Sequence, residues 1–413
     1  MKLSIIICVY NTATDYLAEC IRSIKNSTLK EIEGEYEICM VDDGSTLDYS
    51  ALVDDFGIKY LKTENRGILS ARKTGVGMAS GEYSIFCDSD DTASFNYHRP
   101  MLKKAESTNA DIVINDWAFH TVRMRYFAKK DDTIKHDIDL SGDEKLRAFF
   151  KNSGRQHSYY VLWNKLYKTS LLKKAFENLE NSPYPKNSSY SEDVAINFFA
   201  WRDANRIVNI HTGYYFYRIH PTQTVNTTGK EKILRQVECM TACFDLMRSN
   251  LGNNLYKSEI LTRIDSWSAL MSRAHYSAAK GVGYDDIFPV IKEKYGVKKL
   301  KRSTTRDANG YIGTELLGTN FTEIDSLLFA IWDSPTVKTV KYKKRDKYTA
   351  KCVDFLISSD KAKKTKKANA DVVIPPQKSS WRMKIIHNGI CYKLGLVFFK
   401  KGSRLRNFLK KFI

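Results

Sequence analysis

Two apolar stretches of this chain each run straight into a turn that is rich in carboxylates. The first ends in Cys-Met-Val-Asp-Asp-Gly-Ser at residues 39–45, and the second ends in Phe-Cys-Asp-Ser-Asp-Asp at residues 86–91. An apolar run bounded by turn formers predicts a strand that is buried on both faces, as in a parallel sheet. Ligands bind such sheets at the carboxyl ends of the strands, which is where these side chains would lie.

The second of these turns is crowded with negative charge. The carboxylates of Asp88, Asp90 and Asp91 fall within four residues and repel one another. Such crowding is tolerated best where a divalent cation neutralises it. A strand followed by Asp-x-Asp is therefore typical of a protein that holds a metal ion and a nucleotide diphosphate together.

The first 115 residues alternate between strand and helix patterns. Apolar spacing predicts helices at residues 16–24 and 68–78, and strands at residues 5–10, 36–41, 58–61 and 83–87. Alternation of this kind indicates an α/β fold with a doubly wound, mostly parallel sheet.

Later parts of the chain differ in pattern. Residues 116–225 are irregular and end in an aromatic strand near residues 214–219, whereas helices are expected at residues 233–249, 256–279 and 322–332. A Lys-rich stretch that contains Pro375-Pro376 reads as a linker. The expected organisation is a sheet domain at residues 1–228, a helical C-terminal domain at 229–337, a Lys-rich linker at 338–380 and a basic amphipathic tail at 381–413.

The formal net charge of +19 is unevenly placed. Residues 338–367 contribute +9 and residues 381–413 another +9, which leaves +1 for residues 1–337. A polycationic tail on a neutral body favours a polyanionic partner, either an anionic membrane surface or a nucleic acid. A nucleic-acid binder would not be expected to leave its body neutral, so we expect no nucleic-acid partner.

The tail itself has the pattern of an interfacial basic helix. Leu405, Phe408, Leu409 and Phe412 share one helical face, with Arg and Lys residues opposite. We expect this helix to bind an anionic membrane surface, where each basic residue contributes roughly 1 kcal/mol. A solvated tail without a membrane role is the alternative.

The eight cysteines form no CxxC pair, and several lie inside apolar strands, so reduced thiols in a cytosolic protein are expected. The N-terminal apolar run is expected to be a first strand and not a signal peptide, and no apolar stretch is long enough to predict a membrane-spanning helix. These features favour a cytoplasmic protein that associates peripherally with the inner face of the cell membrane.

Five blocks occur in an order that resembles family 2 glycosyltransferases of the GT-A fold, which is Rossmann-like. They are SIIICVYN at residues 4–11, VDDGS at 41–45, NRGILSARKTG at 65–75, CDSDD at 87–91 and SEDVAINFF at 191–199. The resemblance covers roughly residues 1–225, and its specificity comes from the combination. The chain looks most similar to bacterial enzymes that build capsule, teichoic-acid or lipopolysaccharide chains.

The resemblance implies a nucleotide-sugar site. Asp43 would accept a hydrogen bond from the base, for which the imide N–H of uracil is suited. Gly67 would let the backbone approach the ligand, and Arg72 would reach the phosphates. The implied donor-binding residues are Val9, Tyr10, Asn11, Asp42, Asp43, Asn65, Gly67, Arg72, Asp88 and Ser89.

The resemblance also implies a divalent cation, Mn²⁺ or Mg²⁺. Asp90 would ligate it, and Asp88 would either join Asp90 as a ligand or contact the ribose or a metal-bound water. Such ions often complete their coordination shell from the phosphates of the substrate. His220 is a further candidate ligand, and Asp91 would assist the other two acids.

The general base of the family lies in the block at residues 191–199. Asp193 is the expected base, with Glu192 beside it, and would take a proton from the acceptor hydroxyl as that oxygen attacks the anomeric carbon. Arg72 and the metal would stabilise the charge that grows on the leaving diphosphate. Ser191 is expected to be the N-cap of the helix that carries both acids.

The acceptor contacts are expected nearby in sequence. Trp163 is a candidate platform for a sugar ring, and Asn164 and Lys165 beside it would touch the acceptor. Each assignment has a plain structural alternative. Trp163 would be a core residue, His220 a structural one, Asp42 and Asp43 turn residues, the segment at 65–72 a capped helix start, the acids at 88–91 an exposed loop, and those at 192–193 first-turn acids of a helix.

The sequence thus predicts an inverting, metal-dependent glycosyltransferase. It would move a hexose or N-acetylhexosamine from a nucleoside diphosphate sugar, first of all a UDP-sugar, to a growing cell-surface or lipid-linked glycan. A homo-oligomer is left open. Two rivals remain: a nucleotidyltransferase on a similar sheet, which would show a Gly-rich phosphate loop near residue 10, and a basic nucleic-acid or membrane-binding protein without catalysis.

Overall fold

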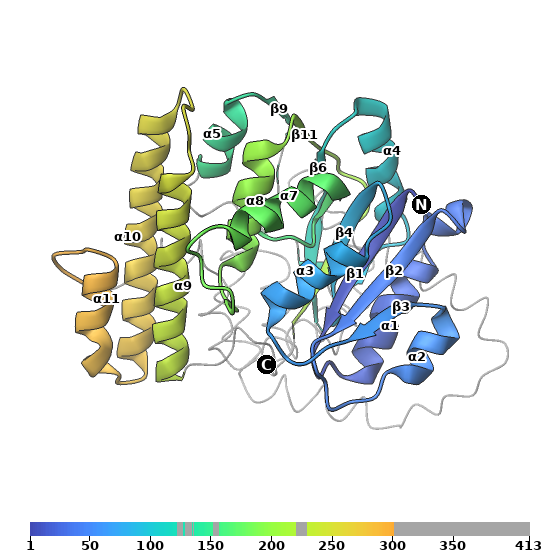
Figure 1. Cartoon of the computed structure of the whole chain (residues 1–413), viewed down its shortest axis with the longest axis horizontal. Coiled ribbons are helices and arrows are strands. Elements are labelled where there is room, and N and C mark those ends of the chain that lie inside the picture. Colours follow the sequence, from blue (N-terminus) through green and yellow to red (C-terminus); the bar gives the residue numbers. More distant parts are fainter. Residues whose placement is uncertain (122–126, 129–133, 135, 152–156, 220–228, 301–413) are drawn as a thin grey trace, which may run out of the picture. The chain divides into compact units, whose positions relative to one another are not determined.

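The computed structural model describes residues 1–121, 127–128, 134, 136–151, 157–219 and 229–300 (Figure 1). The chain divides into two compact units. The first comprises residues 1–118, 130–218 and 227–311, and the second comprises residues 119–129, 219–226 and 312–413. All candidate site residues except His220 belong to the first unit.

The first unit contains a mixed sheet of eight described strands, in the order β3-β2-β1-β4-β10-β6-β11-β9. Neighbours are parallel from β3 through β4 and between β6 and β11, whereas β10 is antiparallel to both its neighbours and β9 is antiparallel to β11. The predicted doubly wound, mostly parallel sheet is confirmed. The strands are β1 (Leu3–Val9), β2 (Tyr36–Asp42), β3 (Lys59–Lys62), β4 (Tyr83–Asp88), β6 (Ile112–Ile114), β9 (Asp139–Ser141), β10 (Lys165–Lys168) and β11 (Arg206–Asn209).

Helices connect the strands and cover the sheet. The predicted helices at residues 68–78 and 16–24 are confirmed as α3 (Ile68–Met78) and α1 (Thr14–Lys25). The sequence prediction omitted several others, namely α2 (Ser50–Phe56), α4 (His98–Thr108), α5 (Glu144–Phe150), α6 (His157–Tyr160) and α7 (Thr169–Glu180). Two of these helices, α4 and α7, carry a clear apolar face of buried residues that the sequence prediction overlooked, and the other three are only four to seven residues long.

The packing of α3 onto the sheet depends on a glycine. A Cβ atom on Gly75 would lie 2.4 Å from Cγ2 of Ile6 in β1, so a larger residue would push the helix outward. Because α3 carries Arg72, this contact fixes the depth at which Arg72 lies beside the strand ends.

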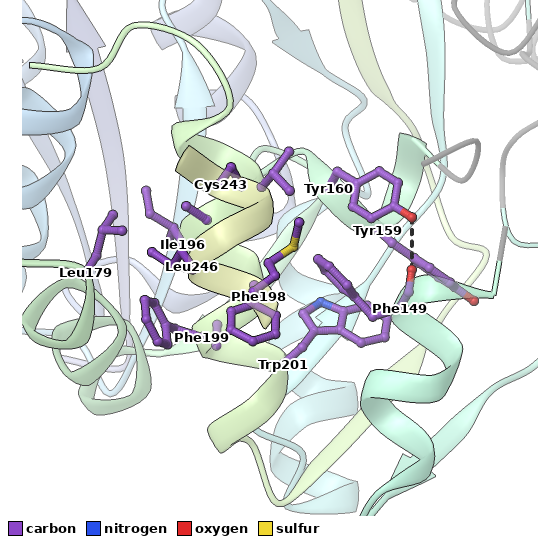
Figure 2. Close-up of a cluster of buried hydrophobic side chains, with 14 of the residues drawn as sticks. Phe149, Tyr159, Tyr160, Leu179, Ile196, Phe198, Phe199, Trp201, Cys243 and Leu246 are labelled. Atoms are coloured by element: carbon purple, nitrogen blue, oxygen red, sulfur yellow. Dashed lines mark hydrogen bonds between the residues drawn. The ribbon is translucent and has the colours of Figure 1, made fainter. Parts of the chain in front are cut away.

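α8 (Glu192–Asp203) runs through the hydrophobic interior, which explains why it is apolar on nearly every side. Figure 2 shows the side chains that surround it, with Ile196, Phe198, Phe199 and Trp201 from α8 itself and Phe149, Tyr159, Tyr160, Leu179, Cys243 and Leu246 from neighbouring helices. Phe149 and Trp201 form an edge-to-face pair with ring centroids 5.3 Å apart. Each fully buried aromatic ring contributes roughly 1.5–3 kcal/mol. The acids that begin α8 are therefore presented by a helix that is held from several sides.

Beyond residue 229, two long helices run side by side, α9 (Lys230–Ser249) and α10 (Lys257–Gly281), followed by the short α11 (Phe288–Lys294) (Figure 1). The helices predicted at residues 233–249 and 256–279 are confirmed. α9 packs against α8, and Trp267 of α10 lies 4.5 Å from the ring of Tyr160. The pair thus shares one hydrophobic cluster with the sheet and braces α8.

Several predictions fall outside the described residues: the helix at residues 322–332, the linker at 338–380, the tail at 381–413 and His220. Of the second unit, the structure describes the antiparallel pairing of β7 (Trp117–Thr121) with β8 (Phe127–Ala128). No helix in the described part of the chain is long and apolar enough to cross a bilayer. All six cysteines of that part are free thiols.

Candidate functional site

The acid-rich loop follows β4, whose parallel neighbour is β1. β4 is buried up to Cys87, and Asp88 is its last residue. The chain turns at once, because the N–H of Asp91 donates to the carbonyl of Asp88 (3.1 Å). The hydroxyl of Ser89 lies 2.6 Å from that of Thr12 in the loop after β1. Two of the predicted donor-binding blocks therefore meet at one edge of the sheet.

Asp42, at the end of β2, holds its own turn. Its side chain is fully buried, and its two carboxylate oxygens accept from the N–H of Ser45 (2.8 Å) and the hydroxyl of Tyr60 (2.9 Å). Asp42 therefore fits the structural alternative of a turn residue, and its donor contact stays a prediction.

Asp43 ties this turn to the segment before α3. Its two carboxylate oxygens accept from the backbone N–H groups of Arg66 and Gly67, each at 2.9 Å. Gly44 has φ +81°, and a Cβ atom there would lie 2.7 Å from the backbone nitrogen of Asn65, so only glycine fits. A carboxylate has roughly four acceptor positions, which leaves Asp43 capacity for a further donor.

The loop after β1 contributes an exposed aromatic ring, Tyr10, and a side chain that stabilises the loop, Asn11. Val9 is buried and offers only its backbone, whereas Tyr10 is 55% exposed. Asn11 adopts φ 51°, and its amide oxygen accepts from both the N–H (2.8 Å) and the hydroxyl (2.9 Å) of Thr46. Tyr10 thus offers an accessible aromatic surface at this edge, while Asn11 secures the loop.

Arg72 joins three of the predicted blocks. It is buried on α3, with Nη1 2.6 Å from Oε1 of Glu192 and Nη2 3.5 Å from Oδ1 of Asp88. Burial acts to lower the pKa of the guanidinium, but the carboxylates of Glu192, Asp88 and Asp193 outweigh it and raise that pKa above its usual value. Arg72 is therefore a permanent cation between the acid loop and the first turn of α8.

The two acids of α8 differ in their surroundings. Glu192 is buried against Arg72, whereas Asp193 is partly exposed and accepts from the N–H of Val194 (2.8 Å). Although part of its surface is exposed, loss of solvent around the carboxylate, together with the charge of Glu192, raises the pKa of Asp193 to about 7 in spite of Arg72. A carboxylate that titrates near neutral pH is suited to accept a proton.

α8 begins where the sequence predicts, directly after Ser191. Ser191 is at the N-cap position in a left-handed conformation with φ 60°. Within the described residues, its hydroxyl bonds to Tyr184 (3.1 Å) and not to a backbone N–H of the helix. The predicted N-cap position of Ser191 is therefore confirmed, but its side chain makes no capping hydrogen bond to the helix.

The three predicted acceptor residues lie in the interior. Asn164 and Lys165 have no exposed surface, and the Lys165 ammonium donates to the carbonyls of Ser158 (2.6 Å) and Val161 (2.5 Å). Trp163 is also buried. Burial lowers the pKa of Lys165 well below its usual value. In this structure all three residues support the interior, and the acceptor contact stays a prediction.

The acid loop suits a hard divalent cation. Burial raises the pKa of Asp88 to about 6, and the charges of Asp90 and Glu192 add to this against Arg72, so negative charge at the loop is incompletely balanced. Among the described residues, no three His, Cys, Asp or Glu side chains are grouped closely enough to hold a metal by themselves. Mg²⁺ is commonly held by one or two carboxylates plus substrate phosphates, and Asp88 with Asp90 fits that requirement.

Two hollows lie away from this edge. One, of about 510 Å³, is lined by residues of α4, by Thr28 and Glu31, and by the loop after β11. Another, of about 550 Å³, is lined by residues 142–143, 146, 202–203 and 250–254. Neither is lined by the residues described above. The chemistry of the strand ends, and not the size of a hollow, therefore identifies the candidate site.

Sequence reasoning missed two side chains that contact the acid loop, Tyr215 and Arg218 of β12 (Tyr215–Ile219). The sequence pattern predicts an aromatic strand at residues 214–219 but no contact between it and the acid loop. An arginine near the end of an aromatic strand is a signal that could have found this contact. If such a strand is buried, its arginine requires partners.

Comparisons with known proteins find similar sequences. Residues 4–176 match the family described as glycosyl transferase family 2. The chain is 26% identical over 310 residues to EpsH of Bacillus subtilis (strain 168), described as a candidate glycosyltransferase, with 70% of this chain and 85% of EpsH covered. It is 25% identical over 359 residues to glycosyltransferase GlyA of Streptococcus pneumoniae serotype 4, with 83% of this chain and 47% of GlyA covered.

Solved structures include similar chains. One is S. aureus TarS 1–349 in complex with UDP-GlcNAc, at 19% identity and a TM-score of 0.45, with 72% of this chain and 92% of that chain covered.

Proposed function

We propose that the chain is a family 2 glycosyltransferase, since residues 4–176 match that family, and that it transfers a hexose or N-acetylhexosamine from a UDP-sugar to a glycan acceptor with inversion. The observation that carries this proposal is the meeting of Asp88, Arg72 and Glu192 at one edge of the sheet, with Asp193 beside them. These residues come from β4, α3 and α8, and together they offer phosphate-binding charge and a base.

The donor would lie across the ends of β1, β2 and β4. Asp43 would use its remaining acceptor capacity for the imide N–H of the base, and the exposed ring of Tyr10 offers a face for stacking. Asp88 and Asp90 would hold Mn²⁺ or Mg²⁺, which when bound supplies positive charge beside the diphosphate.

Transfer would proceed in a single displacement. The acceptor hydroxyl oxygen forms a bond to the anomeric carbon while the bond from that carbon to the diphosphate oxygen breaks. Asp193 takes the hydroxyl proton, and its pKa of about 7 supports this role near neutral pH. Arg72 offsets the charge on the departing diphosphate, and Glu192 holds Arg72 in place.

The acceptor and the membrane are further parts of the proposal. The acceptor would be a growing cell-surface or lipid-linked glycan, and the basic tail at residues 381–413 would hold the enzyme peripherally on an anionic membrane. The motivation is the +9 charge of this tail against +1 for residues 1–337.

A donor screen tests the function. Purified full-length protein is incubated with a panel of UDP-, GDP- and CDP-sugars plus Mn²⁺, and release of the nucleoside diphosphate is measured. Release from one or more UDP-sugars, abolished in Asp193→Asn, is the expected result. Release from GDP- or CDP-sugars alone would replace UDP as the donor, and release from none of the panel would contradict the function.

A further inference from the structure

β12 runs beside the acid loop although it follows that loop by more than a hundred residues in sequence. It pairs in antiparallel register with β5 (Thr92–Ala93), which continues directly from Asp91. The carbonyl of Tyr214 also accepts from the N–H of Ser94 (2.9 Å). The polar ends of β12 side chains are thus positioned to contact the residues of the loop.

Tyr215 binds Asp88, the residue at which β4 ends and the loop begins. Its hydroxyl accepts from the N–H of Asp88 at 2.9 Å, and its side chain is fully buried. The ring stacks on Trp163, with centroids 4.6 Å apart and planes 13° from parallel. Trp163, predicted to touch the acceptor, supports the residue that fixes Asp88.

Arg218 binds the other end of the loop with both main chain and side chain. Its backbone N–H donates to Oδ1 of Asp91 (2.7 Å), and its Nε donates to the carbonyl of Asp90 (2.5 Å). The outer part of the guanidinium reaches α1, where Nη2 lies 2.7 Å from Oε2 of Glu19 and the group stacks 4.5 Å from the ring of Tyr16. One side chain thus links the loop to both β12 and α1.

The guanidinium of Arg218 is buried, which indicates that its hydrogen bonds matter. Arg218 is only 3% exposed, and burying a guanidinium is costly unless its donors are all used in good geometry. A lysine or a neutral residue would be enough to fill the space. The planar guanidinium of Arg218 instead donates both to the carbonyl of Asp90 and to the carboxylate of Glu19, and so fixes the orientation of the Asp90 peptide.

We propose that Arg218 is a positioning residue that fixes the Asp90 peptide so that the carboxylates of Asp88 and Asp90 converge on the cation and the donor diphosphate. Arg218 does not touch the donor itself. This inference rests on the proposed function, because it concerns how the acid loop is held for a metal-bound nucleotide. Residues that orient metal ligands typically change metal affinity by about 10–100-fold when they are altered.

The test uses full-length protein with Mn²⁺ and UDP as probes. Calorimetric titration of UDP at several Mn²⁺ concentrations measures Mn²⁺ half-saturation separately from UDP affinity at saturating Mn²⁺. Arg218→Lys should raise the half-saturating Mn²⁺ concentration about tenfold and change UDP affinity at saturating Mn²⁺ by less than about threefold. Arg206→Lys is the matched control, since Arg206 forms a two-point ion pair with Asp139 away from the loop, and it should behave as the wild type.

A second variant covers the case in which Arg218→Lys does not fold. Glu19→Gln keeps Arg218 but weakens its outer anchor, and should shift Mn²⁺ half-saturation in the same direction by a smaller factor. Arg218 is only structural if Arg218→Lys unfolds at lower temperature than the wild type but has the same half-saturating Mn²⁺ concentration. Where Arg218→Lys does not fold, the same outcome for Glu19→Gln leads to the same conclusion. Wild-type protein that binds no UDP with Mn²⁺ would instead overturn the proposed function, and this inference with it.

Discussion

Arg72 and Glu192 form a buried ion pair, with 2.6 Å between Nη1 and Oε1, across 120 residues of sequence. The pair connects α3, which follows the donor segment, to α8, which carries the candidate base. Both side chains are about nine-tenths buried. Removing one partner of such a pair leaves an uncompensated charge in the interior, which is costly.

Glu192→Ala is therefore expected to lower the free energy of unfolding by about 3 kcal/mol. Asp88 lies 3.5 Å from the same guanidinium and compensates part of the loss. Urea denaturation followed by circular dichroism measures the change. Glu180→Ala is the matched control. Glu180 pairs with Lys73, which lies on α3 next to Arg72, but this pair is exposed, and exposed ion pairs contribute about 0–1 kcal/mol. Equal losses in the two variants would contradict the buried pair.

Turnover should depend on pH through Asp193. A base must be unprotonated to accept a proton, and the pKa of Asp193 is raised to about 7. Turnover should rise roughly tenfold per pH unit below pH 7 and level off above it. Glu192→Gln removes a neighbouring negative charge, so the midpoint of the profile should move to lower pH. Initial rates at saturating donor, measured from pH 5 to 9, check both expectations, and a midpoint that moved upward would contradict the assignment.

Asp193→Asn should separate chemistry from binding. Turnover should fall on the order of 10²-fold or more, while UDP affinity stays near that of the wild type, because the donor groups are untouched. Single-turnover rates and UDP titration measure the two quantities. Glu192→Gln should be milder, and a reversed order of the two effects would assign the base to Glu192.

Metal removal should stop transfer. Excess chelator should abolish activity and added Mn²⁺ or Mg²⁺ should restore it, because Asp88 and Asp90 require a cation to face a diphosphate together. Asp90→Asn should lose both activity and Mn²⁺-dependent UDP binding. Asp55→Asn, on the exposed side of α2, is the control. Full activity in excess chelator would exclude the metal.

Gly44 should be far less tolerant of a methyl group than Gly57. Both have positive φ, +81° and +59°, so an alanine is strained at either position. A Cβ at Gly44 would meet the backbone of Asn65, whereas at Gly57 the described residues leave the space open. Gly44→Ala should cost about 1 kcal/mol or more beyond Gly57→Ala and weaken UDP binding. Thermal unfolding and UDP titration provide the comparison, and equal effects would contradict the close approach.

The sequence pattern predicted the donor side of the fold well. The bounds of α3 and the ends of β2 and β4 follow from apolar runs that stop at Asp and Gly, so Asp43 and Asp88 could be placed at the sheet edge in advance. The partners of these residues could not be predicted. The pairing of Arg72 with Glu192 and the contact of Arg218 with Asp90 join segments that are distant in sequence, and no local pattern encodes them.

The acceptor side was harder for a physical reason. Trp163, Asn164 and Lys165 combine an aromatic ring with polar groups, as sugar-binding surfaces do, but the same composition also builds a buried polar network. Lys165 uses its three donors on two carbonyls and the Asn164 amide oxygen. Whether such a run faces solvent or the core depends on how α8 and β12 pack over it, which periodicity does not reveal.

The bond between the N–H of Asp88 and the hydroxyl of Tyr215 also bears on how the protein is made. The two residues are 127 positions apart, and Arg218 joins the loop later still. A ribosome that builds the chain from its N-terminus releases β1, β2 and β4 early, and domains tend to fold in that order. The acid loop nevertheless lacks its supports until residue 218 has emerged. A nascent chain that ends before β12 should therefore contain all the donor-side strands and still be unable to hold the loop in its final conformation.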